Sequence, residues 1–356
     1  MTVPEKMTAV RIVAHGGPDV LELAEVPVPV PAVGEVLVEV RAAALNNTDL
    51  WTRQGAYGTP EDPEALAGWR GPLDFPRIQG ADVAGVIIAV GPGGDAGLEG
   101  RRVVIDPAIY DAEGPQANPV GLMGSERDGG YAQHVIAPVR QVHDVTGSSL
   151  SDAQLASLPT AYGTALGMIE RGGVREGETV LVTGASGGVG LALVQLAAAR
   201  GARVLAVSSG SKLEAVRSAG ADATVDRAQD IVGQVRAAAD GGVDVVLDVV
   251  AGDLVGEGLS LLREGGRWVI AGALGGHGVG FDVRRLYLHN AQIVGSSMHT
   301  REHFALLMDI ARGAQVQPVI AATYPLDQAA RAQEELGRRH HVGKIVLDPQ
   351  EAAPPA

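Results

Sequence analysis

Four glycines near the middle of the chain, at positions 184, 187, 188 and 190, form the pattern with the clearest chemistry. They follow an apolar, β-branched segment, residues 180–183, and precede an alanine- and leucine-rich segment, residues 191–200, that is typical of a helix. Strand, glycine turn and helix in this order predict a dinucleotide-binding βαβ unit, whose backbone approaches a pyrophosphate at the helix N-terminus. An ordinary glycine turn is the alternative. The residues assigned to the pyrophosphate are Ser186, Gly187, Gly188, Val189 and Gly190.

The end of the next predicted strand, residues 203–207, indicates which nucleotide binds. In dinucleotide-binding folds an acidic residue at this place binds the adenosine ribose 2′-hydroxyl and selects NAD. Here the strand runs into Ser208-Ser209-Gly210-Ser211-Lys212, which contains no carboxylate. Because small hydroxyls and an ammonium suit a 2′-phosphate, Ser208 and Lys212 favour NADP(H) as the cofactor. The alternative for Lys212 is a solvated lysine in the first turn of a helix.

These residues need a parallel sheet to position them, and the second half of the chain predicts one. Short apolar strands alternate there with helices, which is the pattern of a doubly wound α/β sheet. The predicted strands are residues 179–183, 203–208, 224–226, 243–249, 267–271 and 292–296. The helices between the first five strands are predicted at residues 189–200, 212–219, 231–239 and 256–262, after helices at 151–157 and 162–171.

The first half of the chain predicts a different architecture, a barrel-like antiparallel domain. Polar and apolar residues alternate with a period of two in several segments, as in half-buried strands. The strands are predicted at residues 7–13, 35–42, 83–90, 102–105 and 131–136. The prolines at 27, 29 and 31 exclude a central strand over residues 26–31. After the parallel sheet come helices at 301–311 and 327–338 and a strand at 344–347, which we expect to return to the first domain; residues 348–356 are expected to be disordered.

Composition excludes several classes of function. The 356 residues include no cysteine, which excludes disulfides, thiolate catalysis and cysteine-ligated zinc or iron–sulfur sites. The formal net charge of −14 argues against nucleic-acid and anionic-membrane partners, both of which require a basic surface. Neither a run of about 18 apolar residues nor a signal-peptide core is found, so a cytoplasmic protein is expected.

Together the two architectures and the glycine motif resemble the medium-chain dehydrogenase/reductase superfamily, and within it the zinc-independent quinone oxidoreductases. The similarity covers nearly the whole chain. It implies a split GroES-like catalytic domain, residues 1–156 and 300–356, around a Rossmann NADP-binding domain, residues 157–299. It also implies a homodimer that pairs the edge strands of the Rossmann sheets, which would put residues 292–296 at the interface.

The same resemblance supplies candidate site residues. The stretch from Asn46 to Gly55 is similar to the quinone reductase pattern Asn-x-x-Asp-x-aromatic-x-Arg-x-Gly, in which the Asn and Asp lie beside the nicotinamide and the substrate. It implies catalytic roles for Asn46, Asp49 and the downstream Tyr57. For Asp49 the alternative is a structural helix cap, and for Tyr57 an aromatic wall of the pocket. The resemblance adds these cofactor contacts: Thr164, Gly272, Ala273 and Lys344, the last with a surface lysine as its alternative.

Zinc-dependent alcohol dehydrogenases are the close competitor, and absent residues separate them from this chain. Their catalytic zinc uses a cysteine at the position of Asn46 and a His-Glu pair where this chain has Ala81-Asp82. Their structural zinc lobe uses four cysteines, whereas residues 107–128 contain none. We therefore expect no metal. Residues 58–76 form a longer loop than is typical of quinone reductases, which makes a reshaped pocket the expectation.

Chemistry without a Lewis acid favours an acceptor that can delocalise negative charge. Hydride addition to a quinone or an α,β-unsaturated carbonyl gives a hydroquinone anion or an enolate, which hydrogen-bond donors can stabilise. The sequence therefore predicts NADPH-dependent reduction of a small quinone or enone. The alternatives are a non-redox use of the fold, as a cyclase, lyase or nucleotide-binding module, and a zinc-type alcohol dehydrogenase.

Overall fold

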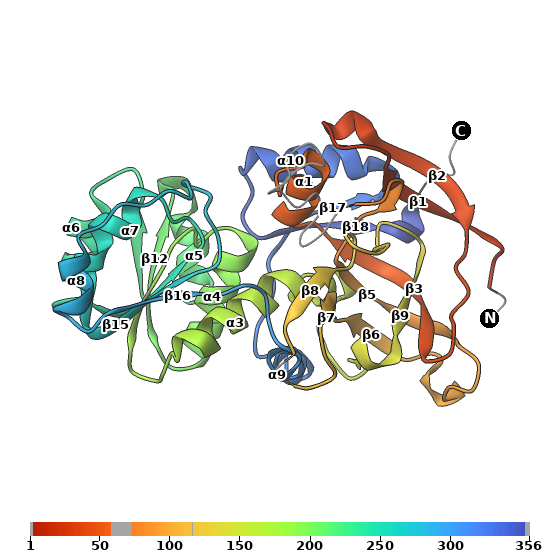
Figure 1. Cartoon of the computed structure of the whole chain (residues 1–356), viewed down its shortest axis with the longest axis horizontal. Helices are drawn as coiled ribbons and strands as arrows, with labels where there is room; N and C mark the ends of the chain where they lie inside the picture. The colour runs from red at the N-terminus through yellow and green to blue at the C-terminus, as the bar shows by residue number, and fades with distance from the viewer. Residues whose placement is uncertain (1–2, 58–72, 116, 353–356) are drawn as a thin grey trace. The chain divides into compact units, whose positions relative to one another are not determined.

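A computed structural model describes residues 3–57, 73–115 and 117–352 of the chain (Figure 1). The chain divides into two compact units. The first unit consists of Met1–Thr160, Thr300–Ala314 and Pro318–Ala356, and the second of Ala161–His299 and Gln315–Gln317. Within the described residues, no helix has the length and apolar character needed to cross a bilayer.

The second unit is built on a six-stranded parallel sheet with the order β13-β12-β11-β14-β15-β16. The strands are β11 (Thr179–Val182), β12 (Arg203–Ser208), β13 (Ala223–Asp226), β14 (Val243–Asp248), β15 (Leu262–Ile270) and β16 (Gln292–Gly295). The helices are α3 (Gly163–Gly172), α4 (Gly188–Ala199), α5 (Leu213–Ser218), α6 (Ile231–Ala238), α7 (Asp253–Gly258) and α8 (Val283–Tyr287). The strand order reverses between β11 and β14, which is where doubly wound folds bind nucleotides.

The six predicted strands and the Rossmann topology are confirmed. Central strands of this sheet are apolar throughout because helices cover both faces, and Val180, Leu181 and Val182 are all fully buried. Two boundaries were wrong. The helix predicted over residues 256–262 starts earlier and ends at Gly258, and β15 begins at Leu262, five residues before the predicted start.

The first unit contains a seven-stranded sheet, in which β10-β6-β5-β3-β18-β17 are neighbours and β9 also pairs with β3. Its strands are β3 (Glu35–Ala44), β5 (Asp82–Val90), β6 (Arg102–Ile105), β9 (His134–Pro138), β10 (Val142–Asp144), β17 (Ile320–Pro325) and β18 (Lys344–Asp348). Smaller sheets join β1 (Lys6–Ile12), β2 (Leu21–Pro27) and β4 (Arg77–Ile78), and β7 (Ala108–Tyr110) with β8 (Pro119–Leu122). The helices are α1 (Asn47–Gln54), α2 (Asp152–Ala156), α9 (Arg301–Arg312) and α10 (Ala329–Arg338).

The end of the chain completes the sheet of the first unit, as predicted. Strand β18 pairs antiparallel with β3 through Leu347 opposite Ala43 and Val346 opposite Ala44, so blue and red segments lie side by side in Figure 1. The parallel neighbour β17 was not predicted. The expected disorder after residue 347 was wrong for the described part, because Asp348 ends β18 and a 3-10 turn, Pro349–Glu351, follows. Residues 353–356 lie outside the described part.

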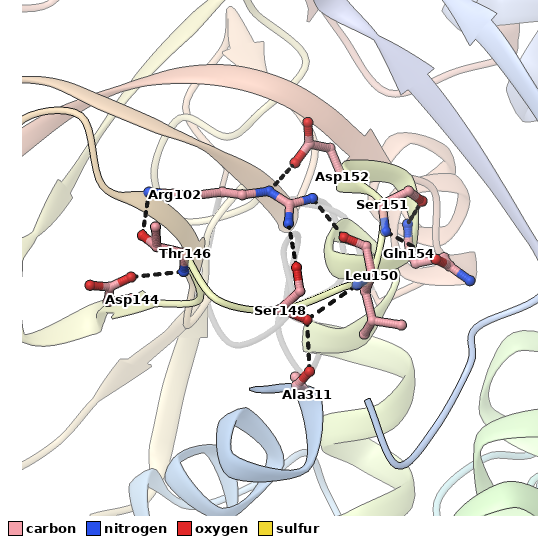
Figure 2. Close-up of polar contacts among 9 residues, drawn as sticks. All are labelled: Arg102, Asp144, Thr146, Ser148, Leu150, Ser151, Asp152, Gln154 and Ala311. Atoms are coloured by element: carbon pink, nitrogen blue, oxygen red, sulfur yellow. Dashed lines mark hydrogen bonds and ion pairs between the residues drawn. The ribbon is translucent and has the colours of Figure 1, made fainter. Parts of the chain in front are cut away.

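A polar cluster fixes α9 to the elements that precede α2 (Figure 2). The Arg102 guanidinium donates to the Asp152 carboxylate at 2.6 Å and to the carbonyl oxygens of Ser148 and Leu150 at 3.2 and 2.8 Å. The Ser148 hydroxyl donates to the carbonyl of Ala311 at 2.8 Å, near the end of α9. The Ala311 carbonyl also accepts from the N–H of Ala314 at 3.2 Å, so Ser148 is a further donor at the end of α9. The cluster thereby ties α9 to the first unit.

Candidate active site

The glycine turn after β11 has the close backbone packing that a phosphate-binding turn needs. Gly184 has a φ of +57°, in the left-handed region that favours glycine. A Cβ on Gly190 would lie 2.2 Å from the carbonyl oxygen of Gly184, so a side chain there would displace backbone. Helix α4 starts at Gly188, and Gly187 provides no side-chain cap. The first N–H groups of α4 therefore remain available to an anion, and this turn fits a dinucleotide pyrophosphate.

The end of β12 combines a buried hydroxyl with two cations. Ser208 is only 3% exposed, and its Oγ has no hydrogen-bond partner within the described structure. Its carbonyl accepts from the backbone N–H of Arg227 at 2.9 Å. Partial burial and then the charge of Arg227 lower the pKa of Lys212. Arg227 was missed in the sequence because it follows β13 and reaches this place only through the pairing of β12 with β13.

A carboxylate also lies near these cations. A Cβ on Gly210 would be 3.2 Å from Oδ2 of Asp226, the last residue of β13. The Oδ1 atom of Asp226 accepts from the backbone N–H of Ala228 at 3.0 Å. Asp226 was missed in the sequence because it ends β13 rather than β12.

A fully buried carboxylate, Asp248 at the end of β14, organises the loop that follows it. It accepts from the Thr183 hydroxyl at 2.6 Å and from the Trp268 indole N–H at 2.9 Å. Two backbone N–H groups, of Val250 and Ala251, donate to it at 2.8 and 3.0 Å. Asp248 thus joins the ends of β11, β14 and β15, and it holds Ala251 at a φ of +55°.

The loop after β15 packs on the same segment. A Cβ on Gly272 would lie 2.8 Å from the carbonyl oxygen of Val249, and the N–H of Gly275 donates to the carbonyl of Val250 at 2.7 Å. Ala273 is exposed beside Gly272. Thr164, in the first turn of α3, is 9% exposed.

In the first unit, Asn46 and Asp49 form the start of α1. Asn46 is the N-cap, and its backbone N–H donates to Oδ2 of Asp49 at 2.7 Å. The Tyr131 hydroxyl donates to the same oxygen at 2.9 Å. Burial raises the pKa of Asp49 to about 7, although both hydrogen bonds oppose the rise. The capping role that was the alternative for Asp49 is therefore present.

Tyr57 lies two residues after the stretch from Asn46 to Gly55. Its hydroxyl donates to Oγ1 of Thr48 at 3.2 Å, and its ring packs edge-on against Trp51. Burial raises the pKa of Tyr57. Thr48 was missed because its position in the motif carries no fixed residue type. Most of the long loop expected to shape the pocket, residues 58–72, lies outside the described residues.

Lys344 is buried beside Asn46. Its Nζ donates to the Leu45 carbonyl at 2.7 Å, to Asn46 Oδ1 at 2.5 Å and to Asp82 Oδ2 at 3.3 Å. Asp82 is fully buried, and its other oxygen accepts from the N–H of Thr160 at 2.8 Å. Burial lowers the pKa of Lys344, and the charge of Asp82 opposes this. All three N–H donors of the ammonium are thus used by oxygens of the first unit.

A series of hydrogen bonds made by buried side chains holds α1 in place. Gln79 Nε2 donates to the carbonyl of Asp49 at 2.8 Å, and Gln333 Nε2 donates to Gln79 Oε1 at 3.0 Å. Arg53 Nε in turn donates to Gln333 Oε1 at 2.7 Å. These bonds connect α10 with α1 and fix the helix that carries Asp49 and Thr48.

The donor set around Asn46 does not fit a zinc ion. The Lys344 ammonium lies between the Asn46 and Asp82 oxygens, and the chain has no cysteine. Across residues 3–57, 73–115 and 117–352, no three His, Asp or Glu side chains gather as a metal site.

Comparison with known families agrees with this architecture. Residues 32–147 match the family described as alcohol dehydrogenase GroES-like domain, and residues 188–313 match the family described as zinc-binding dehydrogenase. The quinone oxidoreductase of Mus musculus is 33% identical, over 96% of this chain and 97% of its own length. The chain belongs to the medium-chain dehydrogenase/reductase superfamily. Members of this superfamily are oxidoreductases that use a nicotinamide cofactor, and the relatives of this chain include quinone oxidoreductases.

Two further proteins are similar to this chain over almost its whole length. The acryloyl-coenzyme A reductase of Metallosphaera sedula is 31% identical, over 94% of this chain and 98% of its own length. A solved structure of a candidate alcohol dehydrogenase from Sinorhizobium meliloti 1021 is 43% identical, with a TM-score of 0.92 and 97% of each chain covered. The predicted combination of a GroES-like domain with a Rossmann domain is thereby confirmed.

Proposed function

We propose that this protein is an NADPH-dependent reductase of quinones or α,β-unsaturated carbonyl compounds. The observation that carries the proposal is the Lys344 ammonium, which takes the place between Asn46 and Asp82 where zinc-dependent relatives need metal ligands. An acceptor that delocalises its own negative charge requires hydrogen-bond donors rather than a Lewis acid. The names of the mouse and Metallosphaera relatives support the same class of acceptor.

The choice of NADPH rests on the end of β12. The buried Ser208 hydroxyl has no partner in the described structure, and Lys212 and Arg227 place two cations near it. A 2′-phosphate would supply acceptors for these groups. Asp226 favours the second candidate, NADH, because a carboxylate suits a ribose hydroxyl and repels a phosphate.

The turn from Ser186 to Gly190 holds the pyrophosphate, and Thr164, Gly272 and Ala273 contact the nicotinamide side of the cofactor. When bound, the nicotinamide supplies the hydride. Asn46 orients the acceptor, and Asp49 holds the start of α1. Tyr57, with Thr48 as its hydrogen-bond partner, donates to the reduced acceptor.

The test is oxidation of NADPH, followed by its near-ultraviolet absorbance, with 1,4-benzoquinone and a panel of enones. We expect turnover with NADPH and with at least one conjugated acceptor. Tight NADPH binding without turnover of any acceptor would instead support a non-redox role. Oxidation of simple alcohols together with stoichiometric zinc in metal analysis would support a zinc-type alcohol dehydrogenase.

We also propose a cytoplasmic homodimer. Strand β16 lies at the edge of its sheet, so one side of its backbone is free to pair with a second copy. Large apolar side chains are exposed on β16 and on and just after α8: Val283, Tyr287, Leu288 and Ile293. Light scattering should give the mass of a dimer, and I293K should reduce it to that of a monomer.

A further inference from the structure

The orientation of the Asn46 side chain decides what this residue can do. A primary amide carries an acceptor oxygen at one end and two N–H donors at the other. An ammonium has three donors and no acceptor. Because the Lys344 ammonium lies 2.5 Å from Asn46, the amide atom that faces it must be the oxygen. The NH2 group of Asn46 therefore points away from Lys344.

The NH2 group is nearly unused within the described structure. Its one hydrogen bond there is a long contact of 3.4 Å to the carbonyl oxygen of Ala44. Asn46 is 8% exposed, in contrast to the fully buried Asp82, so part of this residue remains accessible. An N–H donor is thus available at a position whose acceptor end is already occupied.

The backbone fixes the ammonium at this place. Strand β18 pairs with β3, and the N–H of Leu45 donates to the carbonyl of Ile345 at 2.9 Å, which puts Lys344 next to Leu45 and Asn46. Asp82 anchors the ammonium from the other side, and Thr160 holds the second oxygen of Asp82. The buried charge is therefore paired and cannot turn away from Asn46 at low cost.

We propose that Lys344 and Asp82 are positioning residues that fix Asn46 as a hydrogen-bond donor to the acceptor oxygen on which negative charge develops. The inference rests on the proposed function. When hydride adds to the acceptor carbon, the electron pair of the conjugated system moves to the oxygen. The Asn46 N–H stabilises this anion without giving up its proton, and the proton that completes the reduction comes from another donor.

The first test replaces the donor and keeps its neighbour. N46D has almost the same shape, lacks the NH2 group and gives Lys344 a charged partner, so we expect it to fold with an unchanged or higher Tm. Loss of one such donor lowers kcat by about 100- to 1,000-fold in comparable sites. The Kd of NADPH, measured by fluorescence, should change less than about twofold. N47D, one residue further on, is the matched control and should retain kcat. An N46D variant with kcat within about threefold of wild type would overturn the proposal.

The second test separates positioning from direct contact. K344M alone would leave the buried Asp82 without its partner, so K344M/D82N removes both charges together. If Lys344 acts through Asn46, K344M/D82N lowers kcat in the wild-type background and has little effect once N46A is present. Effects that multiply, or a Kd for NADPH that rises about tenfold at unchanged kcat, would overturn the role and favour a direct cofactor contact.

A measurement without turnover distinguishes this inference from the proposed function. Neutron diffraction of the deuterated wild-type protein reports where the deuterons lie. Three deuterons on Lys344 with the Asn46 oxygen facing them support the inference. A neutral Lys344 amine that accepts from the Asn46 amide overturns it, even in an active enzyme. Failure of the proposed function shows instead as a wild-type protein that reduces no conjugated acceptor.

Discussion

The phosphate-binding turn of the second unit and the polar centre of the first unit are built in opposite ways. The turn depends on the absence of side chains, because the backbone of α4 at Gly190 lies so close to Gly184 that no Cβ fits between them. The centre around Asn46 depends on buried charges, with Asp49, Asp82 and Lys344 almost removed from water. A backbone site is sensitive to volume, whereas a site of buried charges is sensitive to protonation and pairing.

The largest expected effect is a dependence of the unfolding free energy on pH, which comes from Asp49 in the polar centre of the first unit. The pKa of Asp49 is raised from 3.8 to about 7, so the folded chain holds this proton more tightly than the unfolded chain. Stability from this group is complete below about pH 4 and is lost as the pH rises to about 7. Relative to D49N, which cannot titrate, the wild type should lose up to about 4 kcal/mol of unfolding free energy across this range, at 1.36 kcal/mol per pKa unit.

Denaturant titrations of both proteins at several pH values measure this difference. The subtraction removes the contribution of the other carboxylates. Parallel curves for wild type and D49N would mean that Asp49 is ionised throughout, and the first unit would then lack the protonation-sensitive centre described above.

Replacing Gly190 by alanine tests the phosphate-binding turn, which is formed by backbone atoms. G190A puts a Cβ within 2.2 Å of the Gly184 carbonyl oxygen, so the turn must shift. We expect NADPH binding to weaken more than about 100-fold, because small displacements of a positioned site have effects of this size. G187A is the matched control for folding, since its Cβ would lie 3.6 Å from the nearest atom and should leave the Tm unchanged. Wild-type affinity in G190A would show that the turn does not hold the cofactor.

Asp248 is a buried carboxylate in the second unit, whose phosphate-binding turn is formed by backbone atoms. Its substitution tests whether a buried polar group also stabilises that unit. In D248N one end of the amide must face a donor, because Thr183, Trp268 and two backbone N–H groups surround the carboxylate. A buried donor left without an acceptor costs about 2 kcal/mol of unfolding free energy. D240N changes an exposed aspartate and should cost less than about 0.5 kcal/mol. Equal Tm values for the two variants would contradict the role given to Asp248.

The smallest effect concerns the choice of nucleotide. K212A/R227A should weaken NADPH binding about tenfold and leave NADH unaffected, because 1.4 kcal/mol corresponds to one hydrogen bond to a charged group. R217A, an exposed arginine that pairs with Glu214, is the control. Equal losses for both nucleotides would remove the 2′-phosphate from the proposal, and D226N then tests the preference for NADH.

The two regions also differ in how far the sequence predicted them. The second unit repeats a local strand–helix pattern, so its strands and their parallel arrangement followed from hydrophobic periodicity. Strand β17 was missed because Ile320 and Tyr324 are separated by small and polar residues that carry little periodic signal. The partners of Asn46 were missed for another reason. Lys344 is 298 positions away in the sequence, and only the pairing of β18 with β3 brings the two together.

Arg227 and Asp226 show the same limit at shorter range. Asp226 ends β13 and Arg227 follows it, and both come near Ser208 and Lys212 through the register of two parallel strands. The residue pattern at the end of β12 identifies only the side chains that β12 itself contributes. The side chains contributed by the adjacent strand are set by tertiary pairing.

The return of β17 and β18 to the first unit has a consequence for synthesis. A ribosome makes β3 and Asn46 before the second unit and Lys344 after it. Until then the β18 edge of β3 is unpaired, and Asn46 and Asp82 have no ammonium between them. A chain that stops between β16 and β18 therefore carries the complete parallel sheet of the second unit but lacks the residue that pairs with Asp82. The strand that completes the centre around Asn46 is made only after the second unit.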